Sequence, residues 1–143
     1  LIASAGTGSL LAAMAIAFKG DVKRKDIFIP FSALVFSFAI LSVAFSWNFY
    51  LSMFFLFFAG WGGVSLLAVS NSFIQNSVSD SLRGRVMSLY TIVFLGFAPI
   101  GNSLIGIAAH TLGTILSLKI FALLCIAASI IFGIRLRRED TGR

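Results

Sequence analysis

The charged residues of this chain gather in three short segments, separated by long stretches that carry almost no charge. These basic segments are residues 19–26, 80–85 and 135–143, and Lys119 is the one charged residue outside them. A helix needs about 20 apolar residues, each rising about 1.5 Å, to cross the hydrocarbon core of a bilayer. Each uncharged stretch is too long for one crossing and suits two, so we expect each to form a helical hairpin in a membrane.

The composition agrees with this interpretation. Hydrophobic residues make up 59% of the sequence and charged residues 11%, and the mean hydropathy is +1.02. Soluble domains carry about a quarter charged residues. The sequence therefore predicts an all-α integral membrane protein. The expected spans are residues 1–18, 27–46, 49–73, 86–109 and 114–134.

The charge pattern also predicts an orientation. The net charge is +6, and paired crossings bring all three basic segments to one face of the bilayer. Because Lys and Arg are enriched in cytoplasmic loops, we expect that face and the C-terminus to be cytoplasmic. The positive charge then needs no nucleic acid to explain it. Leu1 falls inside an apolar run, so we expect a missing N-terminal half with further spans to precede it.

Few residues suit catalysis or metal binding. Cys125 is the only cysteine, and the only histidine, His110, is expected at the outer face, whereas all five carboxylates fall on the inner side. A His beside a carboxylate, or a cluster of ligands, is therefore not expected. The sequence predicts no enzyme, no metal site and no cofactor.

Small and polar residues follow one side of the third expected helix. At about 100° per residue, they form a stripe along an otherwise apolar helix, and Gln75 follows it near the inner end. The glycines within the stripe allow either close packing on another helix or a bend in this helix. We treat the stripe as a candidate wall of a solute path. The stripe consists of Ser52, Leu56, Gly60, Gly63, Ser70 and Asn71.

The fourth expected helix carries a second stripe. Pro99 lies near mid-membrane, where a proline can kink a helix. Asn102 is a mid-membrane amide, which needs a partner in the protein or a wet cavity; a hydrogen bond to another helix is the alternative. The stripe consists of Ser88, Thr91, Pro99, Asn102, Gly106 and His110.

The other helices differ in character. Small residues are frequent in residues 1–18, which predicts close packing on another helix. Residues 27–46 have no polar face, so we expect this helix to face lipid. Lys119 lies about one turn inside the outer end of the last helix, where its ammonium can reach water along its apolar stem.

Several segments resemble one family of membrane carriers. These are Gly60-Trp-Gly-Gly63, Asn71-Ser-Phe-Ile-Gln75, Asp80-Ser-Leu-Arg-Gly-Arg85 and Gly96-Phe-Ala-Pro-Ile-Gly101. They are similar to the tenth and eleventh helices of the major facilitator superfamily, and most similar to its bacterial drug and siderophore exporters, including enterobactin-exporter-like proteins. The resemblance covers the whole chain as helices eight to twelve of a twelve-helix carrier.

This resemblance implies a secondary-active efflux carrier, such as an antiporter, of small amphipathic solutes, working by alternating access in the bacterial inner membrane. It also implies a cytoplasmic gate. Asp21 and Lys25 match the family's Gly-x-x-x-Asp-Arg-x-Gly-Arg motif, whereas Ala17, Val22 and Arg24 depart from it. In the central loop, we expect a second group to help close or position the cytoplasmic side. That group is Asp80, Arg83, Gly84 and Arg85.

The expected partners are a small-molecule substrate and membrane lipid. No Asp or Glu lies inside an expected span, so a proton gradient driving transport would need a carboxylate from elsewhere. Two alternatives stay open. A non-transporting membrane scaffold would keep Asn71, Gln75 and Asn102 dry and paired to other helices, and an integral-membrane enzyme would need a catalytic pair.

Overall fold

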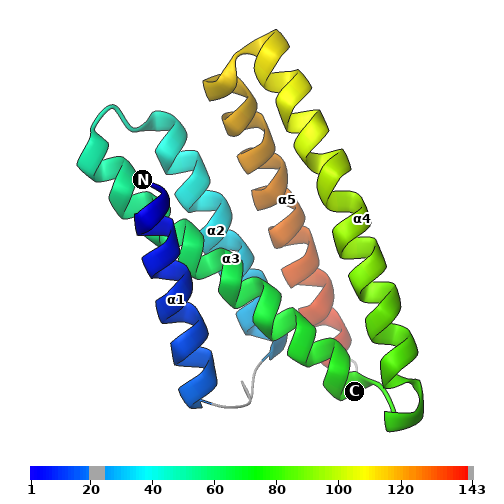
Figure 1. Cartoon of the computed structure of the whole chain (residues 1–143). Coiled ribbons are helices and arrows are strands. Elements are labelled where there is room, and N and C mark those ends of the chain that lie inside the picture. Colours follow the sequence, from blue (N-terminus) through cyan, green and yellow to red (C-terminus); the bar gives the residue numbers. More distant parts are fainter. Residues whose placement is uncertain (20–24, 142–143) are drawn as a thin grey trace.

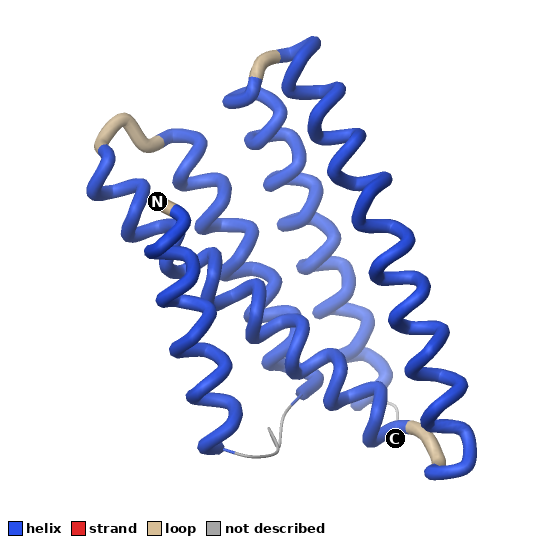
Figure 2. Tube along the Cα trace, in the orientation of Figure 1, coloured by secondary structure: helices blue, strands red, loops and turns tan. Residues whose placement is uncertain are grey.

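A computed structural model describes residues 1–19 and 25–141. The described residues fold into α-helices without any strand, which confirms the predicted all-α membrane fold class (Figures 1 and 2). The helices are α1 (Ile2–Lys19), α2 (Lys25–Phe45), α3 (Phe49–Ser77), α4 (Asp80–Leu112) and α5 (Thr114–Thr141).

Four of the helices are long and apolar enough to cross a membrane. They are α2 from Ile27 onward, α3, α4, and α5 as far as Arg135. The apolar part of α1, Ile2–Phe18, is shorter. The predicted crossings by α2 to α5 thus have the required length and composition, and the crossing by α1 stays a prediction.

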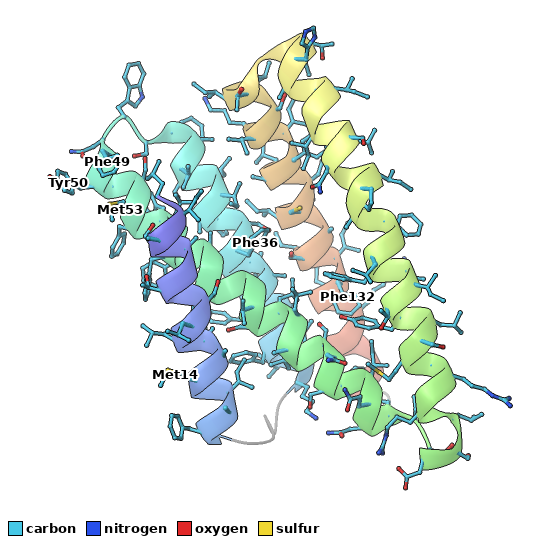
Figure 3. The ribbon with its side chains drawn as sticks, in the orientation of Figure 1. Met14, Phe36, Phe49, Tyr50, Met53 and Phe132 are labelled. Atoms are coloured by element: carbon cyan, nitrogen blue, oxygen red, sulfur yellow. The ribbon has the colours of Figure 1, made fainter. Side chains whose placement is uncertain are left out.

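The two ends of the bundle carry different residues. The α2–α3 and α4–α5 turns lie at one end together with the N-terminus, and the α3–α4 turn and the C-terminus lie at the other (Figure 1). The second end, termed the basic end, contains Lys25, Arg83, Arg85 and Arg135. The first, termed the aromatic end, contains Phe49 and Tyr50 (Figure 3), and Trp47 belongs to the α2–α3 turn at the same end. Both uncharged stretches therefore form hairpins, as the charge pattern predicts.

The connection between α3 and α4 is shorter than the sequence suggests. Helix α3 continues to Ser77 and α4 begins at Asp80, so residues 80–85 are helical and the predicted loop shrinks to Val78 and Ser79. The Ser79 carbonyl accepts hydrogen bonds from the backbone N–H groups of Leu82 and Arg83, each at 3.0 Å. An acidic residue in the first turn favours a helix start. Charged residues indicate where a chain leaves the hydrocarbon, but they do not indicate where a helix ends. The predicted loop was therefore too long.

Helix α3 is the centre of the bundle, because it packs on α1 along one side and on α2 along another. Gly8 of α1 lies against the backbone of Phe57, and Gly60 lies against the carbonyl of Ala5. A Cβ at either glycine would overlap these backbone atoms. The close packing predicted for the first helix is therefore confirmed, and its partner is α3 of the same chain.

Helix α2 packs on both α3 and α5, so the expectation that it faces lipid can apply only to its remaining side, where Phe31 and Phe38 are exposed. Ser32 and Ser37 are buried, and their hydroxyls donate to the carbonyls of Phe28 and Ala33, four residues earlier. A hydroxyl satisfied by its own helix can enter a helix interface without a partner on the other helix. This is why serines scattered around the helix do not reveal which sides are packed.

Helix α4 is the least covered element, since none of its residues is buried. It packs on α5, and it contacts α3 only slightly as the two helices diverge from their shared turn (Figure 1). Pro99 lies within α4, which runs without interruption from Asp80 to Leu112.

Candidate functional site

The part of the α3 stripe nearest the aromatic end is largely in contact with other elements. The Ser52 hydroxyl donates to the Ser46 hydroxyl at 3.0 Å, and Gly60 lies against α1. A Cβ at Gly63 would lie 3.4 Å from the ring of Phe36, and Leu56 is half-buried. At Gly60 the arrangement favours close packing over a bend, and a role of these positions in a solute path stays a prediction.

The part of the stripe nearest the basic end is polar. The Gln75 amide nitrogen donates to the Asn71 side-chain oxygen at 3.0 Å, and both residues are half-buried. One position along, the Ser72 hydroxyl accepts a hydrogen bond from the Lys25 ammonium at 3.2 Å. The start of α2 and the end of α3 are thus joined by a polar contact beside the Asn71–Gln75 pair.

The predicted gate residues at the start of α4 form one local ion pair. The Arg83 guanidinium lies 2.6 Å from the Asp80 carboxylate, and the two side chains are 47% and 89% exposed. Arg85 is exposed, and no atom lies within 4 Å of a Cβ built at Gly84, so no described backbone approaches it closely. Asp21 lies outside the described residues. A gating role for these residues stays a prediction.

The stripe on α4 is exposed along its length. The hydroxyls of Ser88 and Thr91 donate to the carbonyls of Arg85 and Met87 in the same helix. Asn102 is exposed, and its amide makes no hydrogen bond to another described residue. The structure does not bring Asn102 to Asn71 or Gln75, because α3 and α4 diverge from their turn (Figure 1).

Three features of the structure involve residues that the sequence pattern did not select as sites. Ser72 binds Lys25. Ser65 of α3 is buried, and its hydroxyl has no hydrogen-bond partner among the described residues. The Lys119 ammonium lies 4.0 Å from the centre of the Phe45 ring. No local signal identifies Ser72 or Phe45, because serine and phenylalanine are frequent throughout these helices.

These features describe a membrane bundle in which one long apolar helix presents polar groups on an uncovered face. A family model described as transmembrane secretion effector, MFS_3, matches residues 1–142. The chain belongs to this family. No match was found among curated proteins or among solved structures.

Members of the MFS_3 family are transporters of the major facilitator type, which agrees with the resemblance found in the sequence. The family match, together with the four long apolar helices, identifies the chain as an integral membrane protein. A transporter-like function follows from the same match, and the family is not one of enzymes.

Proposed function

We propose that the chain is part of a secondary-active efflux carrier for small amphipathic solutes of drug or siderophore type. The observation that supports this proposal is that α4 has an exposed side with polar groups. The helix is apolar enough to cross a membrane, carries polar groups along one side, and has no buried residue. Its polar side needs a wet surface or a further protein surface to face.

The amide of Asn102 makes the uncovered face of α4 unsuited to lipid. An amide in hydrocarbon without a hydrogen-bond partner is strongly unfavourable, so such groups face a protein interior or a water-filled cavity. Asn102 has no partner among the described residues. A solute path along this face supplies water to the amide and a site near mid-membrane for the solute.

We assign the end of the path nearest the basic end to α3. Asn71 and Gln75 supply hydrogen-bonding groups there, while Leu56 supplies apolar surface farther along the helix. A path with few polar groups and an apolar wall suits an amphipathic solute better than a sugar. In alternating access, two parts of a carrier rock about this path and close one end at a time.

The proposal includes an orientation and an energy source. We place the basic end in the cytoplasm of a bacterial cell, because basic loops are retained on that side of the inner membrane. The residues assigned to this gate are Asp21, Lys25, Asp80, Arg83, Gly84 and Arg85. A proton gradient driving export would act through a carboxylate elsewhere in the carrier, since none lies in the stretches between the basic segments.

The test measures whether the polar face of α4 is wet. In the full-length protein, with Cys125 replaced by serine, Asn102→Cys is exposed to a membrane-impermeant maleimide in vesicles. Leu104→Cys is the matched control, because Leu104 lies on the opposite side of α4 two residues away. We expect Asn102→Cys to be labelled and Leu104→Cys to stay unlabelled. Labelling of neither position from either side of the membrane would contradict a wet path along α4.

A membrane scaffold is the second candidate function. It predicts that the amides pair across helices, whereas Asn71 pairs with Gln75 within α3 and Asn102 has no described partner. The pairing of Asn71 with Gln75 inside one helix favours the carrier. Uptake or efflux measured in vesicles containing the full-length protein separates the two, since a scaffold moves no solute.

A further inference from the structure

A row of phenylalanines follows one side of α2. Phe31, Phe38 and Phe45 are spaced by seven residues, and their side chains are 53%, 55% and 59% exposed. Seven residues make about two helical turns, so the three rings lie one above another along the helix. The row leads from the second turn of α2 to the aromatic end of the bundle.

A groove lies beside this row, between α2 and α3. Its volume is about 430 Å³, within the usual range for sites of small ligands. Phe54, Phe55 and Phe58 form its wall on α3. Ser42 is the one polar residue lining it, and its hydroxyl donates to the carbonyl of Phe38 at 2.8 Å. A groove with this lining suits an apolar chain that needs no hydrogen bond.

A positive charge lies at the aromatic end of the same row. The Lys119 ammonium is 4.0 Å from the centre of the Phe45 ring, which supplies a weak cation–π attraction. All carboxylates of the sequence fall in the three basic segments, and among the described residues of the aromatic end there is no acidic residue beside Lys119. A lysine at this depth requires water or an anion close by.

Room for an anion exists beside Lys119. A shallow, open depression of about 460 Å³ is lined by Lys119 and by the α4–α5 turn at Leu112, Gly113 and Thr114. Trp47, in the α2–α3 turn, and Tyr50, labelled in Figure 3, are strongly exposed at the same end of the bundle. Exposed Trp and Tyr are typical of the level of lipid headgroups. The depression therefore opens where phosphate groups of the bilayer are found.

We propose that these features form one binding site for an anionic phospholipid of the leaflet at the aromatic end. The lipid phosphate binds the Lys119 ammonium in the depression at the α4–α5 turn, and one acyl chain lies in the phenylalanine groove of α2 and α3. The charge of Lys119 selects a net-negative headgroup such as phosphatidylglycerol, since phosphatidylcholine brings a cation of its own. This site does not depend on the proposed transport.

The test measures lipid binding to the purified full-length protein by native mass spectrometry, after removal of endogenous lipid. The probes are dioleoylphosphatidylglycerol, dioleoylphosphatidylcholine with the same chains, and inorganic phosphate. We expect phosphatidylglycerol to bind about threefold to tenfold more tightly than phosphatidylcholine, the effect of one partly screened charge pair. Equal binding of the two lipids would contradict the charge selection. Competition by millimolar phosphate as effective as that by lipid would identify a free-anion site instead.

Two pairs of variants separate the headgroup and chain contacts. Lys119→Met should remove the preference for phosphatidylglycerol and leave phosphatidylcholine unchanged, whereas Lys119→Arg should keep the preference. Phe38→Ala should weaken both lipids by a similar factor, and Phe18→Ala, an exposed residue of α1 near the basic end, should weaken neither. A preference that persists in Lys119→Met, or binding unaffected by Phe38→Ala, would overturn the corresponding half of the site. The melting temperature of each variant shows whether it is folded.

Discussion

At the scale of single residues, the basic end is held by contacts of different kinds. The Asp80–Arg83 pair is exposed and lies within one helical turn, so it contributes less than about 1 kcal/mol to stability. The Lys25–Ser72 hydrogen bond joins two helices and lies in a partly buried position. The first contact lies within the first turn of α4, and the second links α2 to α3.

The weak local pair leads to a prediction about the gate. Arg83→Ala should lower the melting temperature little, because the pair it removes is exposed, yet it should reduce transport several-fold if Arg83 closes the basic end. Initial transport rates in vesicles, corrected for protein abundance in the membrane, measure this. Ser81→Ala, an exposed neighbour in the same turn, is the control. A parental rate in Arg83→Ala would remove Arg83 from the gate.

At the scale of helices, glycine positions divide into those that are packed and those that are open. Gly8 and Gly60 lie against backbone atoms of the opposite helix in the α1–α3 contact. Gly96 and Gly106 of α4 have no atom within 4 Å of a Cβ built on them. Close approach of backbones is the main source of helix association in lipid, so the α1–α3 contact depends on its glycines.

This division predicts opposite effects of the same substitution. Gly60→Ala should destabilise the protein by about 1 to 3 kcal/mol, because the added methyl overlaps the Ala5 carbonyl and α1 must shift. Gly106→Ala should be neutral or stabilise by up to about 1 kcal/mol, because alanine favours a helix and meets no neighbour. Thermal unfolding of the full-length protein in detergent measures both. Equal melting temperatures for the two variants would contradict the α1–α3 contact.

At the scale of the whole molecule, the bundle is unevenly packed. Helix α3 contacts α1 and α2, and α2 contacts α5, whereas α4 contacts mainly α5. The covered helices carry the buried residues, and α4 has none. The polar stripe of α4 thus lies on the helix that other helices cover least. The proposed solute path rests on this exposed polar stripe.

The arrangement of the ends gives a prediction for the whole molecule. The α2–α3 turn and the α3–α4 turn lie at opposite ends of the bundle (Figure 1). Single cysteines at Asn48 and Asp80, in a background without Cys125, should therefore react with an impermeant thiol reagent from opposite sides of the membrane. Inside-out and right-side-out vesicles distinguish the sides. Reaction of both cysteines from one side would disprove the hairpin topology.

Sequence by itself determined the class of the protein, its hairpins and the places where the chain reverses direction. These features follow from local composition, because charged groups are excluded from hydrocarbon and about 20 apolar residues are needed to cross it. The helix was expected to start at Val86, whereas α4 begins at Asp80, because charged residues mark the end of an apolar run and not the end of a helix.

Only the tertiary structure decided what the small and polar residues contact. Gly60 faces α1, Ser32 is buried against α3, and Lys119 lies over Phe45, while Asn102 has no described neighbour to bind. In an apolar helix, a glycine or serine looks the same in sequence whether it meets another helix, lipid or water. What such a residue contacts depends on residues far away along the chain, which come close only when the helices pack.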